Sequence, residues 1–182
     1  MKKQFSLIVL FSTLCFATNI QYESAYTDID IDKNCKTIKI YNIGAIFDCG
    51  TFSNIKIEIL SNDLRDSIDL LRDDKRYSLD FISSITSHFS ELGKKIEWRY
   101  PKGQKENPSA MITRLNIQIE GETAKDLRTD SYLIVSKISH ESICVVEKIA
   151  PQANQNKLAR QIADKSSALP CIINREINER VY

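Results

Sequence analysis

The chain has 182 residues, with 25 Lys and Arg against 24 Asp and Glu and a formal net charge of +1. This length fits one ordinary domain. The near-neutral balance argues against a nucleic-acid or anionic-membrane binder, because such proteins carry a basic stripe. The chain has only five glycines, which disfavours phosphate-cradling loops, and it contains no G-x-G-x-x-G, P-loop, G-x-S-x-G or H-E-x-x-H motif.

The first residues predict export. Lys2 and Lys3 precede an apolar run of twelve residues, 5–16, which is shorter than the roughly 20 needed to span a bilayer. Cys15 and Ala17 are small residues three and one before a cut after Ala17, so residues 1–17 are predicted to be a signal peptide. The alternatives are an uncleaved anchor and a lipoprotein, the latter disfavoured by Leu14. We expect a periplasmic or secreted protein with no membrane span after signal removal.

Four cysteines remain once Cys15 leaves with the signal. An even set in an exported chain suggests disulfides. Three pairings are possible, and we favour the two that close local loops, Cys35–Cys49 and Cys144–Cys171. A zinc site is the rival, but no two cysteines have C-x₂₋₄-C spacing. We therefore predict no metal and no cofactor.

The first mature residues, 19–25, are predicted to be loose, and an edge segment with Ile29 and Ile31 inward follows. The run Asp28, Asp30 and Asp32 has the spacing of the first calcium ligands of an EF-hand. The sixth position is lysine where glycine is needed, and the twelfth is lysine where a bidentate glutamate is needed. Calcium binding is therefore disfavoured, although the sequence leaves open whether this run holds any cation.

Alternating apolar residues predict short strands at 37–41, 45–49, 54–60, 77–81, 95–100 and 110–119. Residues 66–71 suit either a strand or a short helix. Helical spacing predicts a short helix over 82–92, ended by Gly93. The alternation slips between Ile112 and Leu115, which indicates a bulge. Residues 120–129 form a charged connection.

The most strongly patterned unit is near the C-terminus. Strands at 132–138 and 143–149 flank a polar turn, and a helix over 154–167 has Asn154 as its N-cap. Its apolar stripe would cover the strands. We predict an α+β exported domain over 26–173: an antiparallel β-sheet or sandwich of short strands with the C-terminal helix packed on it, stapled by disulfides. Residues 174–182 are predicted to be a flexible tail.

Catalytic groups are few. His88 is predicted to be partly buried, and His140 lies in a tight turn. Neighbours on one turn seldom assemble a triad, so we assign no catalytic residue. The carboxylates between 63 and 74 alternate with cations and suggest a solvated face. Trp98, Arg99 and Tyr100, with Lys102 in the polar loop 101–109, are the candidate binding surface, because Trp, Tyr and Arg dominate interface hot spots. The alternative places Trp98 in the core with Arg99 pointing outward.

Several phrases carry a resemblance. They are Tyr26–Asp30 before Cys35, Cys49-Gly50, Ile96–Arg99, and Cys144 followed by Leu158–Asp164 and Cys171. Together they resemble a group of small uncharacterised secreted proteins of alphaproteobacteria of the rhizobial kind. The chain departs from that pattern at Phe47, where a tryptophan is expected. The resemblance implies a bacterial exported domain with four paired cysteines, and no activity.

The functional expectation follows from export, the cysteines and the missing catalytic constellation. We expect a non-enzymatic protein that binds a macromolecular partner in the periplasm or in a host, as an effector or inhibitor does. The partner is expected to be a protein or an envelope component, and the oligomeric state is left open. The alternatives are a periplasmic hydrolase that uses carboxylates, marked by two close acidic side chains with raised pKa in a cleft, and a structural envelope component.

Overall fold

The computed structural model describes residues 20–120 and 126–172. The predicted signal peptide and the predicted tail at 174–182 lie outside these ranges. In the described part of the chain, no helix is both long and apolar enough to cross a membrane.

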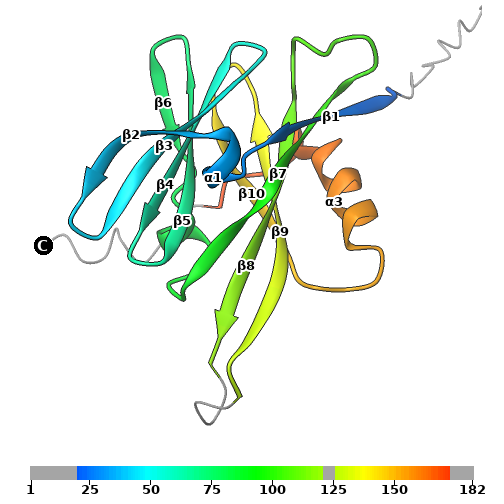
Figure 1. The fold of residues 1–182 in the computed structure, drawn as a ribbon. Coiled ribbons are helices and arrows are strands. Elements are labelled where there is room, and N and C mark those ends of the chain that lie inside the picture. Colours follow the sequence, from blue (N-terminus) through cyan, green and yellow to red (C-terminus); the bar gives the residue numbers. More distant parts are fainter. Residues whose placement is uncertain (1–19, 121–125, 173–182) are drawn as a thin grey trace, which may run out of the picture.

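Ten strands form one mixed, largely antiparallel sheet (Figure 1). They are β1 (Tyr22–Asp28), β2 (Lys36–Tyr41), β3 (Gly44–Phe52), β4 (Ile55–Asn62), β5 (Arg65–Arg72), β6 (Lys75–Ser78), β7 (Ser90–Pro101), β8 (Ala110–Ile119), β9 (Arg128–Ile138) and β10 (Ile143–Ile149). The helices are α1 (Ile31–Asn34), α2 (Phe81–Ser84) and α3 (Gln155–Ala163), with a 3₁₀ turn at Ser166–Ala168. The order is β10-β9-β8-β7-β5-β4-β3-β2; β1 pairs with β7 and β6 pairs with β5.

Strand β7 joins two arms of the sheet: strands β2 to β6 form one arm, and strands β8 to β10 form the other. Its C-terminal half pairs with β1, while its first residue, Ser90, meets Arg65 of β5 in a parallel bridge. One buried cluster contains Ile57 from β4, Trp98 from β7 and Ile134 from β9. Because residues from both arms share this core, the sheet curves until its arms face one another. The beginning of β7 is the point at which the arms diverge.

Helix α3 forms a third layer on the outer face of β8, β9 and β10 (Figure 1). Ala159 and Ala163 pack there against Ile112 and Val135, whereas the neighbouring Ile134 faces the main core. Successive strand residues point to opposite faces, so these strands are apolar on both sides. The predicted sheet with a C-terminal helix packed on it is confirmed.

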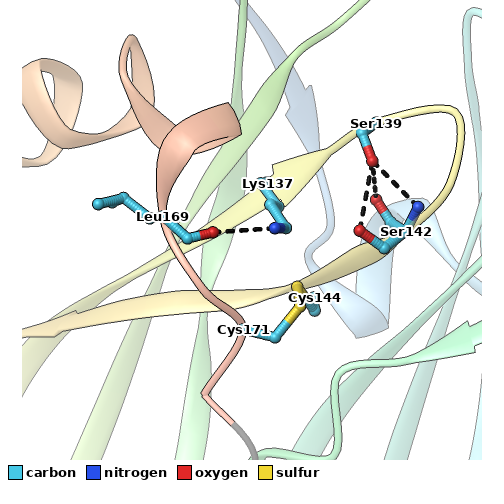
Figure 2. The surroundings of a disulfide bond; sticks show 6 residues. All are labelled: Lys137, Ser139, Ser142, Cys144, Leu169 and Cys171. Carbon is cyan, nitrogen blue, oxygen red and sulfur yellow. Dashed lines mark hydrogen bonds between the residues drawn. A yellow bond between two sulfur atoms is a disulfide. The ribbon is translucent and has the colours of Figure 1, made fainter.

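Two disulfides close local loops. Cys35 bonds Cys49, 14 residues on, and Cys144 bonds Cys171, 27 residues on, which are the two pairs favoured from spacing. Figure 2 shows the second bond holding the chain after α3 against β10. Beside it, the Lys137 ammonium donates to the Leu169 carbonyl at 2.9 Å. The helix is therefore fastened to the sheet on its C-terminal side.

Several sequence predictions are wrong in detail. Residues 22–25, expected to be loose, belong to β1, and α2 spans only Phe81–Ser84 because Ser90 already begins β7. The predicted bulge lies in β7, between Leu92 and Ile96, and β8 keeps a continuous register with β9. Gly93 belongs to this bulge rather than to a helix end. A Cβ there would lie 2.7 Å from the Arg114 Cβ, so glycine lets β7 and β8 approach.

Candidate functional site

A cleft of about 440 Å³ opens where the two arms diverge. The segment from β1 to α1 borders it on one side, and the first residues of β7 border it on the other. The described residues that line it are Ile29, Asp30, Ile31, Asp32, Phe47, Ser61, Leu64, Asp66, Ser90, Glu91, Leu92, Lys94, Asn116, Gln118 and Thr129. The cleft therefore combines apolar side chains with many polar and acidic groups.

Asp66 is the buried acid of the cleft. It follows the β4–β5 turn, and only 5% of its surface is exposed. Its Oδ2 accepts the backbone N–H of Leu92 at 3.0 Å. Burial raises the pKa of the Asp66 carboxyl because the charged form loses hydration, and the hydrogen bonds from Leu92 and Ser61 only partly oppose this. A buried carboxyl with a raised pKa in a cleft marks a candidate functional group.

Asp30 is a carboxylate of a different kind in the same cleft. The backbone N–H of Ile29 donates to the Lys94 carbonyl at 2.9 Å, which places Asp30 beside the Lys94 side chain. The Lys94 ammonium lies 3.0 Å from Asp30 Oδ2, and Lys33 lies 3.9 Å from it. The hydrogen bond from Lys94 lowers the pKa of Asp30. Asp30 is therefore an ionised group that Lys94 largely neutralises.

The charge balance of the cleft is acidic. Its described lining contains four carboxyl groups and one ammonium group. Asp32 and Glu91 are exposed, so they lie toward solvent, whereas Asp66 is buried. Asn116, Gln118 and Thr129 add neutral hydrogen-bonding groups. Clefts lined by one sign of charge concentrate ligands of the opposite sign, so this cleft favours a cation over an anion.

The Asp28, Asp30 and Asp32 run does not converge on one point. Asp28 Oδ1 lies 3.3 Å from the Lys95 ammonium, and Asp30 contacts Lys94. Asp32 belongs to α1, while Asp28 ends β1. Among the described residues, no group of three or more His, Cys, Asp or Glu side chains is arranged to hold a metal ion.

The binding surface proposed from Trp98, Arg99 and Tyr100 is wrong, because all three side chains are buried. Trp98 is fully buried and stacks on Phe52 with ring centroids 4.7 Å apart, so the alternative of a core tryptophan is correct. Lys102 is exposed, in the loop between β7 and β8.

Arg99 does not point outward either. Its guanidinium bonds both oxygens of Asp164 at 2.8 Å and the Ser24 hydroxyl at 2.7 Å. The ion pair joins β7 to the end of α3. The Arg99 charge can be buried because Asp164, 65 residues further along the chain at the end of α3, supplies its carboxylate partner.

The predicted solvated face between 63 and 74 is also wrong in part, since Asp66 and Asp69 are buried. Asp69 stands opposite Glu58 across β4 and β5, and the Arg76 guanidinium lies 2.7 Å from each carboxylate. For Asp66 the sequence held a usable signal. Residues 66, 68 and 70 share one strand face, and Ile68 and Leu70 mark that face as the inner one.

The histidines lie outside the cleft. His88 and His140 are both exposed, so the prediction of a partly buried His88 is wrong. The two disulfides fit folding in an oxidising compartment. Comparison of the chain with protein-family models, curated proteins and solved structures finds no match.

Proposed function

We propose that the protein is an exported, non-enzymatic binding protein whose acidic cleft takes a cationic side chain, Lys or Arg, from a macromolecular partner. One observation carries the proposal. The cleft is lined by a buried carboxyl, Asp66, and by two exposed carboxylates, Asp32 and Glu91. A long cationic side chain suits this arrangement, because its aliphatic stem can lie on apolar surface while its charged end meets a carboxylate.

The electrostatics of Asp66 fit a receptor for a cation. Burial raises the pKa of this carboxyl, so its ionised form is costly without a cation beside it. A cation bound nearby stabilises the ionised form. Part of the favourable interaction free energy between cation and cleft therefore offsets the cost of ionising Asp66. Because ionisation of Asp66 depends on pH, the binding affinity depends on pH as well.

Binding accounts for the cleft better than hydrolysis does. A hydrolase of the carboxylate kind requires two acidic groups with separate roles, one of them held protonated. The raised pKa of Asp66 and the lowered pKa of Asp30 match these two roles in direction. Asp30, however, is held in an ion pair with Lys94 at 3.0 Å, which occupies the carboxylate that the second role requires. The two cleft carboxyls with shifted pKa values are thus one buried acid and one neutralised carboxylate.

The compartment is part of the proposal. Two disulfides support folding under oxidising conditions. The basic and apolar residues at 1–17 have the pattern of a signal peptide. We place the protein in the periplasm or outside the cell, where its partner is a protein or an envelope component.

Calorimetric titration with blocked tripeptides tests the proposal. Ala-Lys-Ala and Ala-Arg-Ala are expected to bind with Kd of about 1 mM, near −4 kcal/mol, and Ala-norleucine-Ala at least tenfold more weakly. Glu91→Gln is expected to weaken the cationic peptides several-fold. Asp74→Asn is the matched control, because it removes the same charge from an exposed turn outside the cleft.

Two results would contradict the proposal. One is equal binding of norleucine and lysine peptides, or no binding of either. The other is turnover of a substrate in a hydrolase panel that Asp66→Asn abolishes, which would favour the carboxylate enzyme instead.

A further inference from the structure

Three exposed apolar side chains lie beside the cleft, and we name them the tip patch: Ile43 and Leu64 on turns, and Phe89 directly before β7. Their exposed fractions are 66%, 72% and 37%. The turns are joined through the backbone: Asp63 N–H donates to the Ile43 carbonyl at 2.8 Å, and Ser90 N–H donates to the Leu64 carbonyl at 3.0 Å. Leu64 also lines the cleft, so the patch is continuous with it.

Leu64 is an unexpected residue at its position. It and Asp63 have φ of 58° and 49°, in the left-handed region that glycine, asparagine and aspartate tolerate best. A leucine there strains the backbone, and this one packs little because most of it is exposed. Neither turn geometry nor core packing explains the choice. Strain of this kind, together with exposed apolar surface, is typical of binding sites.

We propose that the tip patch docks apolar side chains of a partner protein segment whose Lys or Arg enters the acidic cleft. This inference rests on the proposed function and adds the chemistry of the flanking residues. The recognised segment is a basic residue flanked by Leu, Ile or Phe. Buried apolar contacts next to a specific charge pair are how protein interfaces gain both affinity and orientation.

Charge decides between a protein segment and other occupants. The cleft adjoining the patch is acidic, with Asp32 and Glu91 exposed, so it repels the phosphates of an anionic membrane. Arg65, the residue after Leu64, is paired with Asp63 and lies over the Phe89 ring, 4.9 Å from its centroid. A second copy of this face would bring acidic clefts together. A basic, apolar segment is the complementary partner.

Two blocked peptides, Ala-Ala-Lys-Ala-Ala and Leu-Leu-Lys-Leu-Leu, test the inference by calorimetry on the purified protein. Leucine flanks are expected to strengthen binding at least tenfold. In Leu64→Gly and in Ile43→Ser the ratio of the two Kd values is expected to fall below threefold. In Ile43→Ser the alanine-flanked peptide keeps its Kd, because Ile43 is not among the residues that line the cleft. Ile20→Ser is the control, because Ile20 is 59% exposed and precedes β1 near Pro101, the end of β7 remote from Ser90.

Leu64→Gly also separates binding from folding. Glycine relieves the positive φ, so its urea midpoint is expected to match or exceed that of the wild type. Binding of the alanine-flanked peptide without any gain from leucine would overturn the inference and leave the cleft function standing. Absence of binding by both peptides would overturn both. Leu64-dependent binding to phosphatidylglycerol vesicles, with no peptide binding, would overturn the protein segment in favour of a membrane.

Discussion

Asp66 Oδ2 accepts the backbone N–H of Leu92 at 3.0 Å, and this bond crosses from β5 to β7 where the arms of the sheet diverge. The backbone N–H of Ser90 donates to the Leu64 carbonyl at 3.0 Å nearby. The buried acid is therefore also a structural link between the arms. A ligand that changes the charge of Asp66 acts directly on the strand junction that forms the cleft.

The pKa of Asp66 predicts how stability depends on pH. A raised pKa means that the folded state binds the proton more tightly than the unfolded state does. The contribution of Asp66 to stability is therefore greatest when the carboxyl is protonated, and it falls as pH rises through the unfolded and then the folded pKa. Asp66→Asn removes this contribution and retains an oxygen acceptor for Leu92. Urea unfolding at pH 4 and pH 7 should show the variant gaining stability relative to wild type as pH rises. Parallel profiles would contradict the assignment.

Removing the acceptor altogether has a different effect. Asp66→Ala leaves the Leu92 N–H without its partner in a buried site. An unsatisfied buried donor costs about 1–3 kcal/mol, so Asp66→Ala should be less stable than Asp66→Asn by that amount at neutral pH. Urea unfolding measures the difference, and equal stabilities would mean that the bond adds nothing at the junction.

Binding of a cation should release protons. A bound ammonium or guanidinium stabilises ionised Asp66 and lowers its raised pKa. Near that pKa, calorimetry of the lysine peptide in buffers of different ionisation enthalpy should report net proton release, and affinity should weaken as pH falls. Asp66→Asn should abolish the release. Proton uptake, or release unchanged in the variant, would be incompatible with a cation beside Asp66.

The ion pair of Arg99 with Asp164 is predicted to hold α3 on the sheet. Arg99 is 7% exposed, so Asp164→Ala leaves a nearly buried guanidinium without its carboxylate, at a cost of about 3–5 kcal/mol. Arg99→Met in the Asp164→Ala background should recover part of this loss, because the unpaired charge is gone. Denaturant unfolding of the three variants measures both changes. If Asp164→Ala had the same unfolding free energy as the wild type, the ion pair would contribute nothing to stability.

The disulfides should contribute similar amounts. Their loops span 14 and 27 residues, for which the chain-entropy relation gives about 3 and about 3.5 kcal/mol. Replacing Cys144 and Cys171 together by alanine should also expose the end of α3 to hydrogen exchange, because the bond fixes that segment to β10. Replacing Cys35 and Cys49 by alanine should leave the hydrogen exchange of α3 unchanged, so the Cys35–Cys49 variant is the matched control.

The local hydrophobic pattern predicts structure well where burial of a segment produces that pattern. The strands at 132–149 are apolar on both faces, and this correctly indicated a covering helix. The pattern fails where contacts with an element distant in sequence determine the structure of a segment. Ser24 and Ala25 give no strand signal by themselves, and they are ordered by pairing with β7. Phe89 and Leu92 share a helical spacing, but Phe89 is exposed while Leu92 enters the core from β7.

The cleft was harder to predict than the fold because its residues come from six strands and one helix. Asp30 and Asp32 have the spacing of calcium ligands in the sequence, whereas Asp30 in fact contacts Lys94, which lies 64 residues further along the chain. Arg99 was expected to face solvent because its partner, Asp164, lies 65 residues away. Alternation in β5 alone would have placed Asp66 inward with Ile68 and Leu70.

The most direct test is a ¹⁵N-correlated NMR titration with the blocked Ala-Lys-Ala peptide, with the Leu92 amide as the reporter. Because that amide donates to Asp66, a cation in the cleft should shift its resonance together with those of Glu91 and Lys94. The shifts should saturate, and Ala-norleucine-Ala should leave them unchanged. The account would be contradicted if the lysine peptide left the Leu92 amide resonance unshifted, or shifted only the resonances of residues remote from the cleft.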